Sequence, residues 1–393
     1  MHHTILIRKG FFLLSSISFI KIPLKMSYSV LSPAILPDKK NIKNYLKKNK
    51  PKRHNYFNIG DCFVLDAMID SLTPHYPEYI YSVRKDLTEN EIKNINSTKA
   101  LLLPITNRLN DFGKNFPLIK SNTLDKIEVP IILHGMGVSG DPKNNTGMLD
   151  TVKAKYNYIF EKAKYASVRC SLSQTYLTDN FPQLKEKILM TSCPVIFHKH
   201  KLNESGLFKD DKNSILLTVT NRDDFWERES KTIDFIAEKY KKSRKVISMH
   251  DYHLNSQHLT KNKNKFTISN FINEGAFPKN NFDIFIYALS KGFEIYIPRT
   301  VNECFQFYEN FDFHMGSRLH AHLHFLSQGK KSFLTYVDDR CKGFSDDFGF
   351  PICDYKDLNK YLDFDFEIFR NNFFKHLAEM QKFNHYLKDE LLT

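Results

Sequence analysis

Short apolar runs alternate with amphipathic segments from residue 55 onwards, and this alternation constrains the fold more than any other feature. The runs have the unbroken hydrophobicity of strands that are buried on both faces of a parallel sheet. Strands are predicted at 79–83, 100–105, 129–133 and 165–168, and then at 214–220, 245–249, 266–269, 294–297, 312–315 and 332–336. Helices are predicted between them, chiefly at 62–72, 225–240, 283–291, 302–309 and from residues 88, 171 and 319. This pattern predicts an α/β protein with two Rossmann-like domains that face a cleft.

The length of the chain, 393 residues, also favours two domains over one. We place an N-terminal Rossmann-like domain at 55–207 and a C-terminal one at 208–356. Residues 1–54 are interpreted as a leader and a basic linker. Residues 357–393 are predicted to form a C-terminal helical segment.

The net charge of +13 suits a nucleic acid, an anionic membrane or a phosphorylated small substrate. The longest basic run, 47–54, has no interleaved aromatic side chains and matches no nucleic-acid-binding module, so no nucleic-acid partner is predicted. We expect this run, or residues 8–25, to make peripheral contact with the inner face of a membrane.

Cysteine usage and the N-terminal residues indicate the compartment. The six cysteines include no CxxC pair, which favours free thiols in a reducing environment over a disulfide framework or a zinc site. The apolar segment 11–20 has the length of a signal-peptide core, but no small-x-small cleavage site follows it. A cytoplasmic protein is therefore predicted.

The segment from Gly316 to His324 carries the strongest functional signal. It follows a predicted strand and begins a helix, so Arg318 and His320 lie near a helix start, where free N–H groups favour anions. A fixed cation beside an imidazole suits an anionic substrate; an ordinary helix start is the alternative. His320 and His324 are one helical turn apart but lack the glutamate of an HExxH motif, and no metal is predicted.

Two other junctions hold candidate binding residues. Asn58, Gly60 and Asp61 open the first predicted helix, where the glycine would let a ligand approach the backbone. Arg169 ends a predicted strand, and Ser173 follows in a position to cap a helix or hold a phosphate. The alternatives are an ordinary helix entry and a surface arginine.

In this order and at these spacings, the motifs resemble those of the polysaccharide pyruvyl transferase family. The resemblance covers about residues 55–355, and the GSRLH motif is its most specific marker. The matching stretches are NxGD at 58–61, a GxG loop at 135–137, SVR at 167–169, a Cys-Pro-Val-Ile strand at 193–196, GSRLH at 316–320 and a tyrosine-acid-x-x-Lys stretch within 336–344.

The resemblance implies a fold similar to the two-domain glycosyltransferases of the GT-B type. It also implies transfer of pyruvate from phosphoenolpyruvate, as a ketal, to two sugar hydroxyls of a cell-surface glycan or its precursor. The acceptor would be a glycan or a lipid-linked sugar, as in exopolysaccharide or capsule synthesis. No cofactor is expected, since phosphoenolpyruvate is a substrate.

Carried over by motif, the resemblance places function at Asp61, Arg169, Arg318 and His320. Both arginines would bind the anionic donor, His320 would protonate it, and Asp61 would accept a proton from the sugar. Leu319 would pack against the donor. The remaining substrate-binding candidates are Asn58, Gly60, Ser173 and Lys342.

The chain departs from the family pattern at Cys170 and Cys193, where the family usually has aspartate. Two alternatives to pyruvyl transfer remain. The first is a GT-B-type glycosyltransferase in which Arg318 and Lys342 hold the diphosphate of a nucleotide sugar. The second is a non-catalytic glycan-binding or assembly protein, which the two cysteines keep open.

Overall fold

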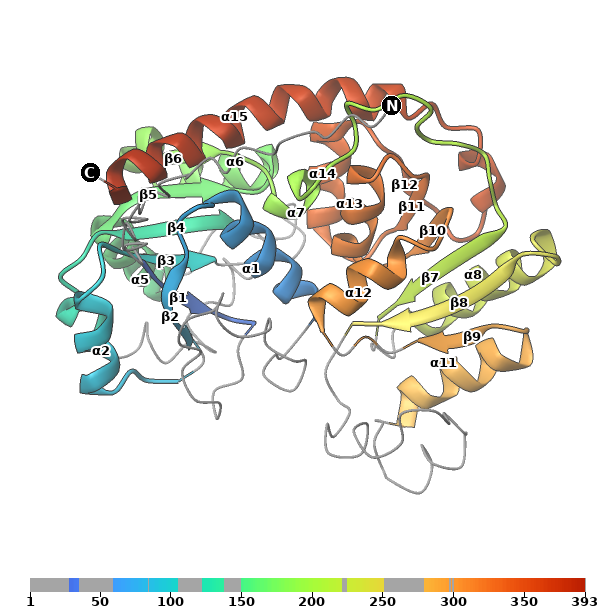
Figure 1. Cartoon of the computed structure of the whole chain (residues 1–393), viewed down its shortest axis with the longest axis horizontal. Helices are drawn as coiled ribbons and strands as arrows, with labels where there is room; N and C mark the ends of the chain where they lie inside the picture. Colours follow the sequence, from blue (N-terminus) through green and yellow to red (C-terminus); the bar gives the residue numbers. More distant parts are fainter. Residues whose placement is uncertain are drawn as a thin grey trace, which may run out of the picture.

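The chain forms two α/β domains that lie side by side (Figure 1). The computed structural model describes residues 28–34, 59–83, 85–104, 122–137, 150–220, 225–250, 279–296, 298 and 300–392. The predicted strand 266–269, the basic run 47–54 and Asn58 lie outside the described residues.

The first domain alternates strands with helices, as predicted. Its elements are β1 (Tyr28–Ser32), α1 (Ile59–Ser71), β2 (Pro77–Ser82), α2 (Glu89–Asn96), β3 (Ala100–Pro104), η2 (Asn122–Lys126), β4 (Ile131–Met136), α5 (Asp150–Lys162), β5 (Ala163–Val168), α6 (Ser171–Asn180), η3 (Pro182–Lys187), β6 (Ile188–Met190) and α7 (Pro194–Phe197).

All strands of the first sheet are parallel, in the order β2-β1-β3-β4-β5-β6. The interpretation of residues 1–54 as leader and linker is wrong for 28–32, because β1 pairs with both β2 and β3 inside this sheet. All five residues of β1 are buried, so this strand is part of the core of the first domain.

The second domain repeats the alternation. Its elements are β7 (Ser214–Val219), α8 (Trp226–Lys239), β8 (Arg244–Met249), α11 (Lys279–Ser290), β9 (Glu294–Tyr296), α12 (Val301–Tyr308), β10 (Phe313–Gly316), α13 (Leu319–Ser327), β11 (Ser332–Thr335), α14 (Asp339–Phe348), β12 (Ile352–Cys353), η5 (Leu358–Tyr361) and α15 (Glu367–Leu392).

The second sheet is also entirely parallel, in the order β12-β11-β10-β7-β8-β9. The chain starts at β7 in the middle, builds outwards to β9, and returns to β10 on the other side of β7. Ligands of doubly wound sheets bind where the strand order reverses in this way. The switch point of this sheet therefore lies between β7 and β10.

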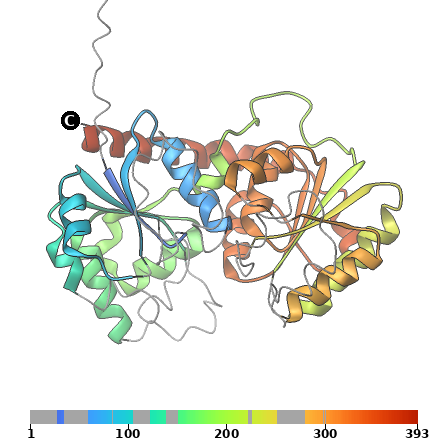
Figure 2. The same ribbon diagram turned by 60° about the horizontal axis from the view of Figure 1, so that its bottom comes forward.

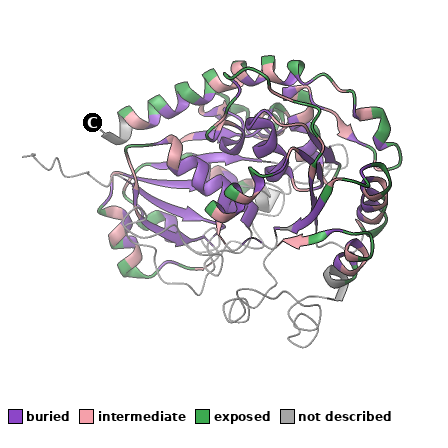
Figure 3. Ribbon diagram, turned by 45° about the vertical axis from the view of Figure 1, so that its right-hand side comes forward, coloured by how far each residue is buried: buried purple, intermediate pink, exposed green. Residues whose placement is uncertain are grey.

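Several contacts join the two domains. Helix α1 of the first packs on α12 and α13 of the second, where the rings of Phe63 and Phe305 lie 4.5 Å apart. Helix α15 starts on the second domain and crosses to the first (Figures 1 and 2), where Phe383 contacts His134 and Tyr386 contacts Tyr165. The strands are largely buried, whereas α15 exposes its outer face (Figure 3).

The predicted α/β class with two Rossmann-like domains is confirmed; the GT-B-like arrangement stays a prediction. The domain boundaries at 207 and 356 stay predictions. The Cys-Pro-Val-Ile stretch is not a strand: Pro194 begins the short helix α7, because its fixed backbone angle suits the first position of a helix. No helix in the described ranges is long and apolar enough to cross a bilayer.

Candidate functional site

The site is built around the switch point of the second sheet. Strand β10 ends at Gly316, whose φ is +141°. A Cβ atom there would lie 2.1 Å from the carbonyl oxygen of Thr218 in β7, so only glycine fits. This close approach fixes the start of α13, which carries the GSRLH motif, against the end of β7.

Glu229 of α8 forms hydrogen bonds at the ends of both β7 and β10. Its Oε1 accepts hydrogen bonds from the hydroxyl of Ser317 at 2.9 Å and from the backbone N–H of Thr220 at 3.1 Å. The guanidinium of Arg228 donates to the same oxygen at 2.7 Å. Glu229 and Arg228 are both buried, and nothing in the sequence marks them beyond the amphipathic pattern of their helix.

Arg318 lies at the N-cap of α13. Its Nε donates to the carbonyl oxygen of Val219 at 2.6 Å, which holds the side chain across the end of β7. The arginine is thus not a freely solvated residue.

Arg169 is placed by the first domain. It follows β5 and is almost fully buried. Its Nε donates to the carbonyl oxygen of Gly135 at 2.6 Å, and its backbone N–H donates to Met136 at 2.8 Å. The GxG loop therefore contributes a backbone oxygen that orients Arg169.

His320 lies where the two domains meet. Burial lowers the pKa of its imidazole well below the ordinary value of 6.5. Three guanidinium groups lower this pKa further, and they belong to Arg169, Arg340 and Arg318. Among the described residues, nothing forms a hydrogen bond with its Nε2, although this atom is buried.

The structure adds Arg340 to the predicted set. It lies at the start of α14 and forms a two-pronged ion pair with Asp338, at 2.8 Å from Nε to Oδ1. Burial opposes the charge of Arg340, but the carboxylate of Asp338 outweighs burial and raises the pKa of the guanidinium. The charge of Asp61, in α1, favours the charged form of both Arg340 and Arg169, so its carboxylate lies near both guanidinium groups. Asp61, Arg169, Arg318, His320 and Arg340 are called the cluster below.

The other predicted site residues lie in different parts of the structure. Gly60 lies in the first turn of α1, and Leu319 is buried in the first turn of α13. Ser173 is buried, and its hydroxyl bonds to the thiol of Cys170 at 3.1 Å. Lys342 is exposed on α14. In that helix it is Arg340, two residues earlier, that contributes positive charge to the cluster.

Cys170 and Cys193, the two cysteines that depart from the family pattern, are buried close to Arg169. Burial raises the pKa of both thiols, and that of Cys170 reaches about 11. All six cysteines of the chain are free thiols. Cys170 is the N-cap of α6 and makes no side-chain capping bond.

One group of three metal-type donors occurs in the ranges that the structure describes: Asp66, Asp70 and His198, with donor atoms within 4.8 Å of one another. Nε2 of His198 lies 2.9 Å from Oδ2 of Asp70, and the ammonium of Lys199 lies 3.4 Å from the same oxygen. A metal ion held by this group would replace the direct contact between His198 and Asp70 and compete with the ammonium of Lys199. The sequence did not predict this group.

Chemically, the cluster combines guanidinium groups from both domains, one neutral imidazole and one carboxylate. Guanidinium groups bind carboxylate and phosphate through paired hydrogen bonds. A buried imidazole nitrogen without a partner is an atom that a bound ligand can satisfy. The arrangement suits a small substrate that carries more than one negative charge and exchanges a proton.

The model of the polysaccharide pyruvyl transferase family matches residues 58–339, which include the whole cluster except Arg340. No curated protein sequence matches the chain.

Solved structures resemble it distantly. S. aureus MnaA with UDP is 13% identical, covering 84% of this chain and 87% of that one, with a TM-score of 0.45. The UDP-GlcNAc 2-epimerase of Neisseria meningitidis, bound to UDP-GlcNAc, is 14% identical, with coverages of 84% and 86% and a TM-score of 0.43. The wall teichoic acid polymerase TagF is 13% identical, with coverages of 93% and 88% and a TM-score of 0.45.

Proposed function

The chain belongs to the polysaccharide pyruvyl transferase family, and from this premise we propose that it transfers pyruvate from phosphoenolpyruvate to a sugar. The product is a ketal across two hydroxyls of a surface glycan or of its lipid-linked precursor. The observation that carries the proposal is the position of His320: its buried Nε2, which has no hydrogen-bond partner among the described residues, lies among the charges of Arg169, Arg318 and Arg340.

The donor matches this charge distribution. Phosphoenolpyruvate carries a carboxylate and a phosphate, and the three guanidinium groups, which come from both domains, offer positive charge and N–H donors to both groups. Arg318 and Arg340 come from the second domain, and Arg169 comes from the first. Binding of the donor would therefore hold the domains together.

His320 is proposed as the proton donor to the vinyl carbon of phosphoenolpyruvate. In the free protein its pKa lies well below 6.5, so the ring is neutral at pH 7. The negative charges of the donor offset the arginines and raise this pKa, which lets the ring take up a proton as the substrate binds. The proton then moves to the vinyl carbon and completes the methyl group of pyruvate.

Asp61 is proposed as the acceptor of a hydroxyl proton from the sugar. The first hydroxyl oxygen bonds to the central carbon of the protonated donor, and the second displaces phosphate from it. The guanidinium groups stabilise the phosphate as it leaves. The atoms balance: one phosphoenolpyruvate and two hydroxyls give one ketal and one phosphate.

The alternative is a glycosyltransferase that uses a nucleotide sugar. One observation favours it: the reversal of strand order beside Arg318 is the position where doubly wound sheets bind nucleotides. In that case Arg318 and Arg340 would hold a diphosphate. A non-catalytic glycan-binding protein is the third candidate, and it rests on the thiols at Cys170 and Cys193.

A direct assay separates the three. The purified protein is incubated with a sugar acceptor and either phosphoenolpyruvate or a panel of nucleotide sugars, and release of phosphate or nucleotide is followed. With the acceptor present, we expect phosphate release from phosphoenolpyruvate and no nucleotide release from any nucleotide sugar. Nucleotide release would support the glycosyltransferase, and glycan binding without either product would support the binding protein.

A cytoplasmic location at the inner membrane face is also proposed. Phosphoenolpyruvate is a cytoplasmic metabolite, and the six free thiols suit a reducing compartment. A cytoplasmic enzyme at the inner membrane face, held there by the basic N-terminal residues, would meet a lipid-linked acceptor. Cell fractionation with and without residues 1–25 tests this proposal.

A further inference from the structure

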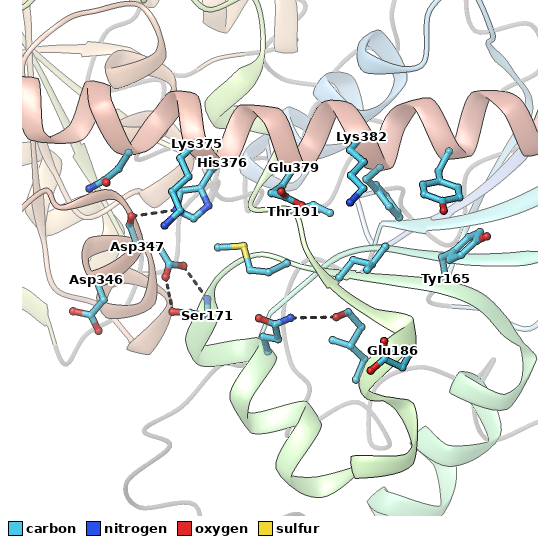
Figure 4. A pocket seen from close by; sticks show the side chains of 17 residues that line it. Tyr165, Ser171, Glu186, Thr191, Asp346, Asp347, Lys375, His376, Glu379 and Lys382 are labelled. Carbon is cyan, nitrogen blue, oxygen red and sulfur yellow. Dashed lines mark hydrogen bonds between the residues drawn. The ribbon is translucent and has the colours of Figure 1, made fainter.

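The start of α6 is capped by a residue of the other domain. Cys170, at the N-cap, makes no side-chain capping bond. Instead, Asp347 of α14 accepts hydrogen bonds from the backbone N–H of Ser171, at 2.8 Å, and from its hydroxyl. Figure 4 shows both bonds at one end of a groove of about 900 Å³, lined by α6, β6, α14 and α15.

The two helices also approach closely at this point. A Cβ atom on Gly343 of α14 would lie 2.5 Å from Sγ of Cys170 and 3.3 Å from Cβ of Leu172. Gly343 therefore lets α14 pack directly on the first turn of α6, one helical turn before Asp347. The carboxylate and the glycine together fix both the distance and the register of the two helices.

This contact is coupled to the candidate site through both of its helices. Arg340 lies in the first turn of α14, and Arg169 immediately precedes the N-cap of α6. Any shift of α14 along or away from α6 would move Arg340 relative to Arg169.

We propose that Asp347 is a positioning residue that fastens the two domains in the arrangement in which Arg169 and Arg340 bind one anion. The inference rests on the proposed function only in taking that anion to be the phosphate of the donor. A carboxylate at a helix N-terminus is favoured by the free N–H groups there and by the helix dipole. Hydrogen bonds to charged groups are stronger than those between neutral groups, so these two bonds favour one arrangement of the domains over others.

The test uses the full chain and inorganic phosphate as the probe. Asp347→Asn keeps the shape but removes the charge, and Asp347→Ala removes both bonds. Asp346→Asn is the matched control, because Asp346 is the exposed neighbour. We expect the dissociation constant for phosphate, measured by calorimetry, to rise about 10-fold in Asp347→Asn and more in Asp347→Ala. We also expect a larger radius of gyration in X-ray scattering and no change in the control.

Ser171→Ala provides a milder variant if Asp347→Ala does not fold, since it removes the hydroxyl bond and leaves the backbone bond. It should weaken phosphate binding less than Asp347→Asn. Unchanged phosphate affinity and scattering in folded Asp347→Asn would overturn the proposal, even if its melting temperature fell, because only a structural role would then remain.

Failure of the proposed function would look different. Neither phosphate affinity nor scattering depends on pyruvyl transfer. Suppose that the wild-type protein shows no turnover with phosphoenolpyruvate, but Asp347→Asn binds phosphate more weakly than the wild type. The positioning role of Asp347 would then stand without the pyruvyl transfer reaction. If turnover with phosphoenolpyruvate is found, Asp347→Asn should raise KM for this donor more than it lowers kcat, and Asp346→Asn should change neither.

Discussion

His320 of the second domain lies close enough to Arg169 of the first for the arginine's charge to lower the pKa of the imidazole. The two residues come from different sheets, and each follows the carboxyl end of a strand. Neither domain alone therefore holds the complete cluster. The proposed function therefore requires the two domains to be held against one another.

The buried histidines make stability sensitive to acid. Burial lowers the pKa of five of them, to about 3 for His134, His314 and His324 and well below 6.5 for His320 and His322. Below pH 6.5 the unfolded chain binds protons at these rings and the folded chain does not. The free energy of unfolding should therefore fall as the pH falls below 6.5, by about 1.4 kcal/mol per histidine and pH unit.

Denaturant unfolding between pH 7.5 and pH 5 measures this slope, which should correspond to roughly four to five protons taken up on unfolding at pH 5.5. A flat profile across this range would contradict the burial of these rings.

Gly316→Ala should be strongly destabilising, because the new Cβ would overlap the carbonyl oxygen of Thr218. Gly292→Ala is the matched control: its φ of +81° is also unfavourable for alanine, but nothing lies within 4 Å of the added atom. The control should cost about 1–2 kcal/mol, the usual penalty for a left-handed residue. Thermal unfolding compares the two, and equal losses would show that β10 does not approach β7 as closely as described.

Glu229→Gln should destabilise the strand ends that carry Ser317 and Thr220. It leaves the buried Arg228 without its carboxylate, and breaking a buried pair in this way costs about 3–5 kcal/mol. Glu227→Gln, at an exposed position on the same helix, should change stability far less. Chemical unfolding of both variants tests the difference, and similar values would exclude a structural role for Glu229.

His320→Ala and Arg318→Lys should have different kinetic effects. Loss of a general acid lowers kcat by roughly 10²–10⁴-fold. Arg318→Lys keeps the charge but loses the planar pair of donors, so it should mainly raise KM for phosphoenolpyruvate. Steady-state kinetics with a sugar acceptor measures both, with His385→Ala as the control. Wild-type turnover in His320→Ala would remove this residue from the chemistry.

Much of the fold could be predicted because buried parallel strands leave long apolar runs in the sequence. Strand β1 was missed since it has only five residues and lies in a segment that was interpreted as leader and linker. The helix α7 was mistaken for a strand because a run of four residues has no period, and Pro194 was the available signal for a helix start.

The site was predictable only in part. GSRLH and SVR lie at strand ends, so the positions of Arg318, His320 and Arg169 follow from the alternating pattern. Arg340 was missed because α14 was not predicted, and without the helix a sequence does not show which of Arg340 and Lys342 points inwards. The lowered pKa of His320 depends on its burial and on the contact between the two domains, which brings Arg169 close to it. No local sequence pattern contains that information.

The central claim is tested most directly by running the reaction in D₂O with phosphoenolpyruvate and a sugar acceptor, and observing the product by NMR. If His320 protonates the vinyl carbon, the ketal should carry a methyl group with one deuterium, formed together with one equivalent of phosphate. The same product should be nearly absent with His320→Ala. A glycoside product formed from a nucleotide sugar, with no ketal methyl signal from phosphoenolpyruvate, would contradict the account.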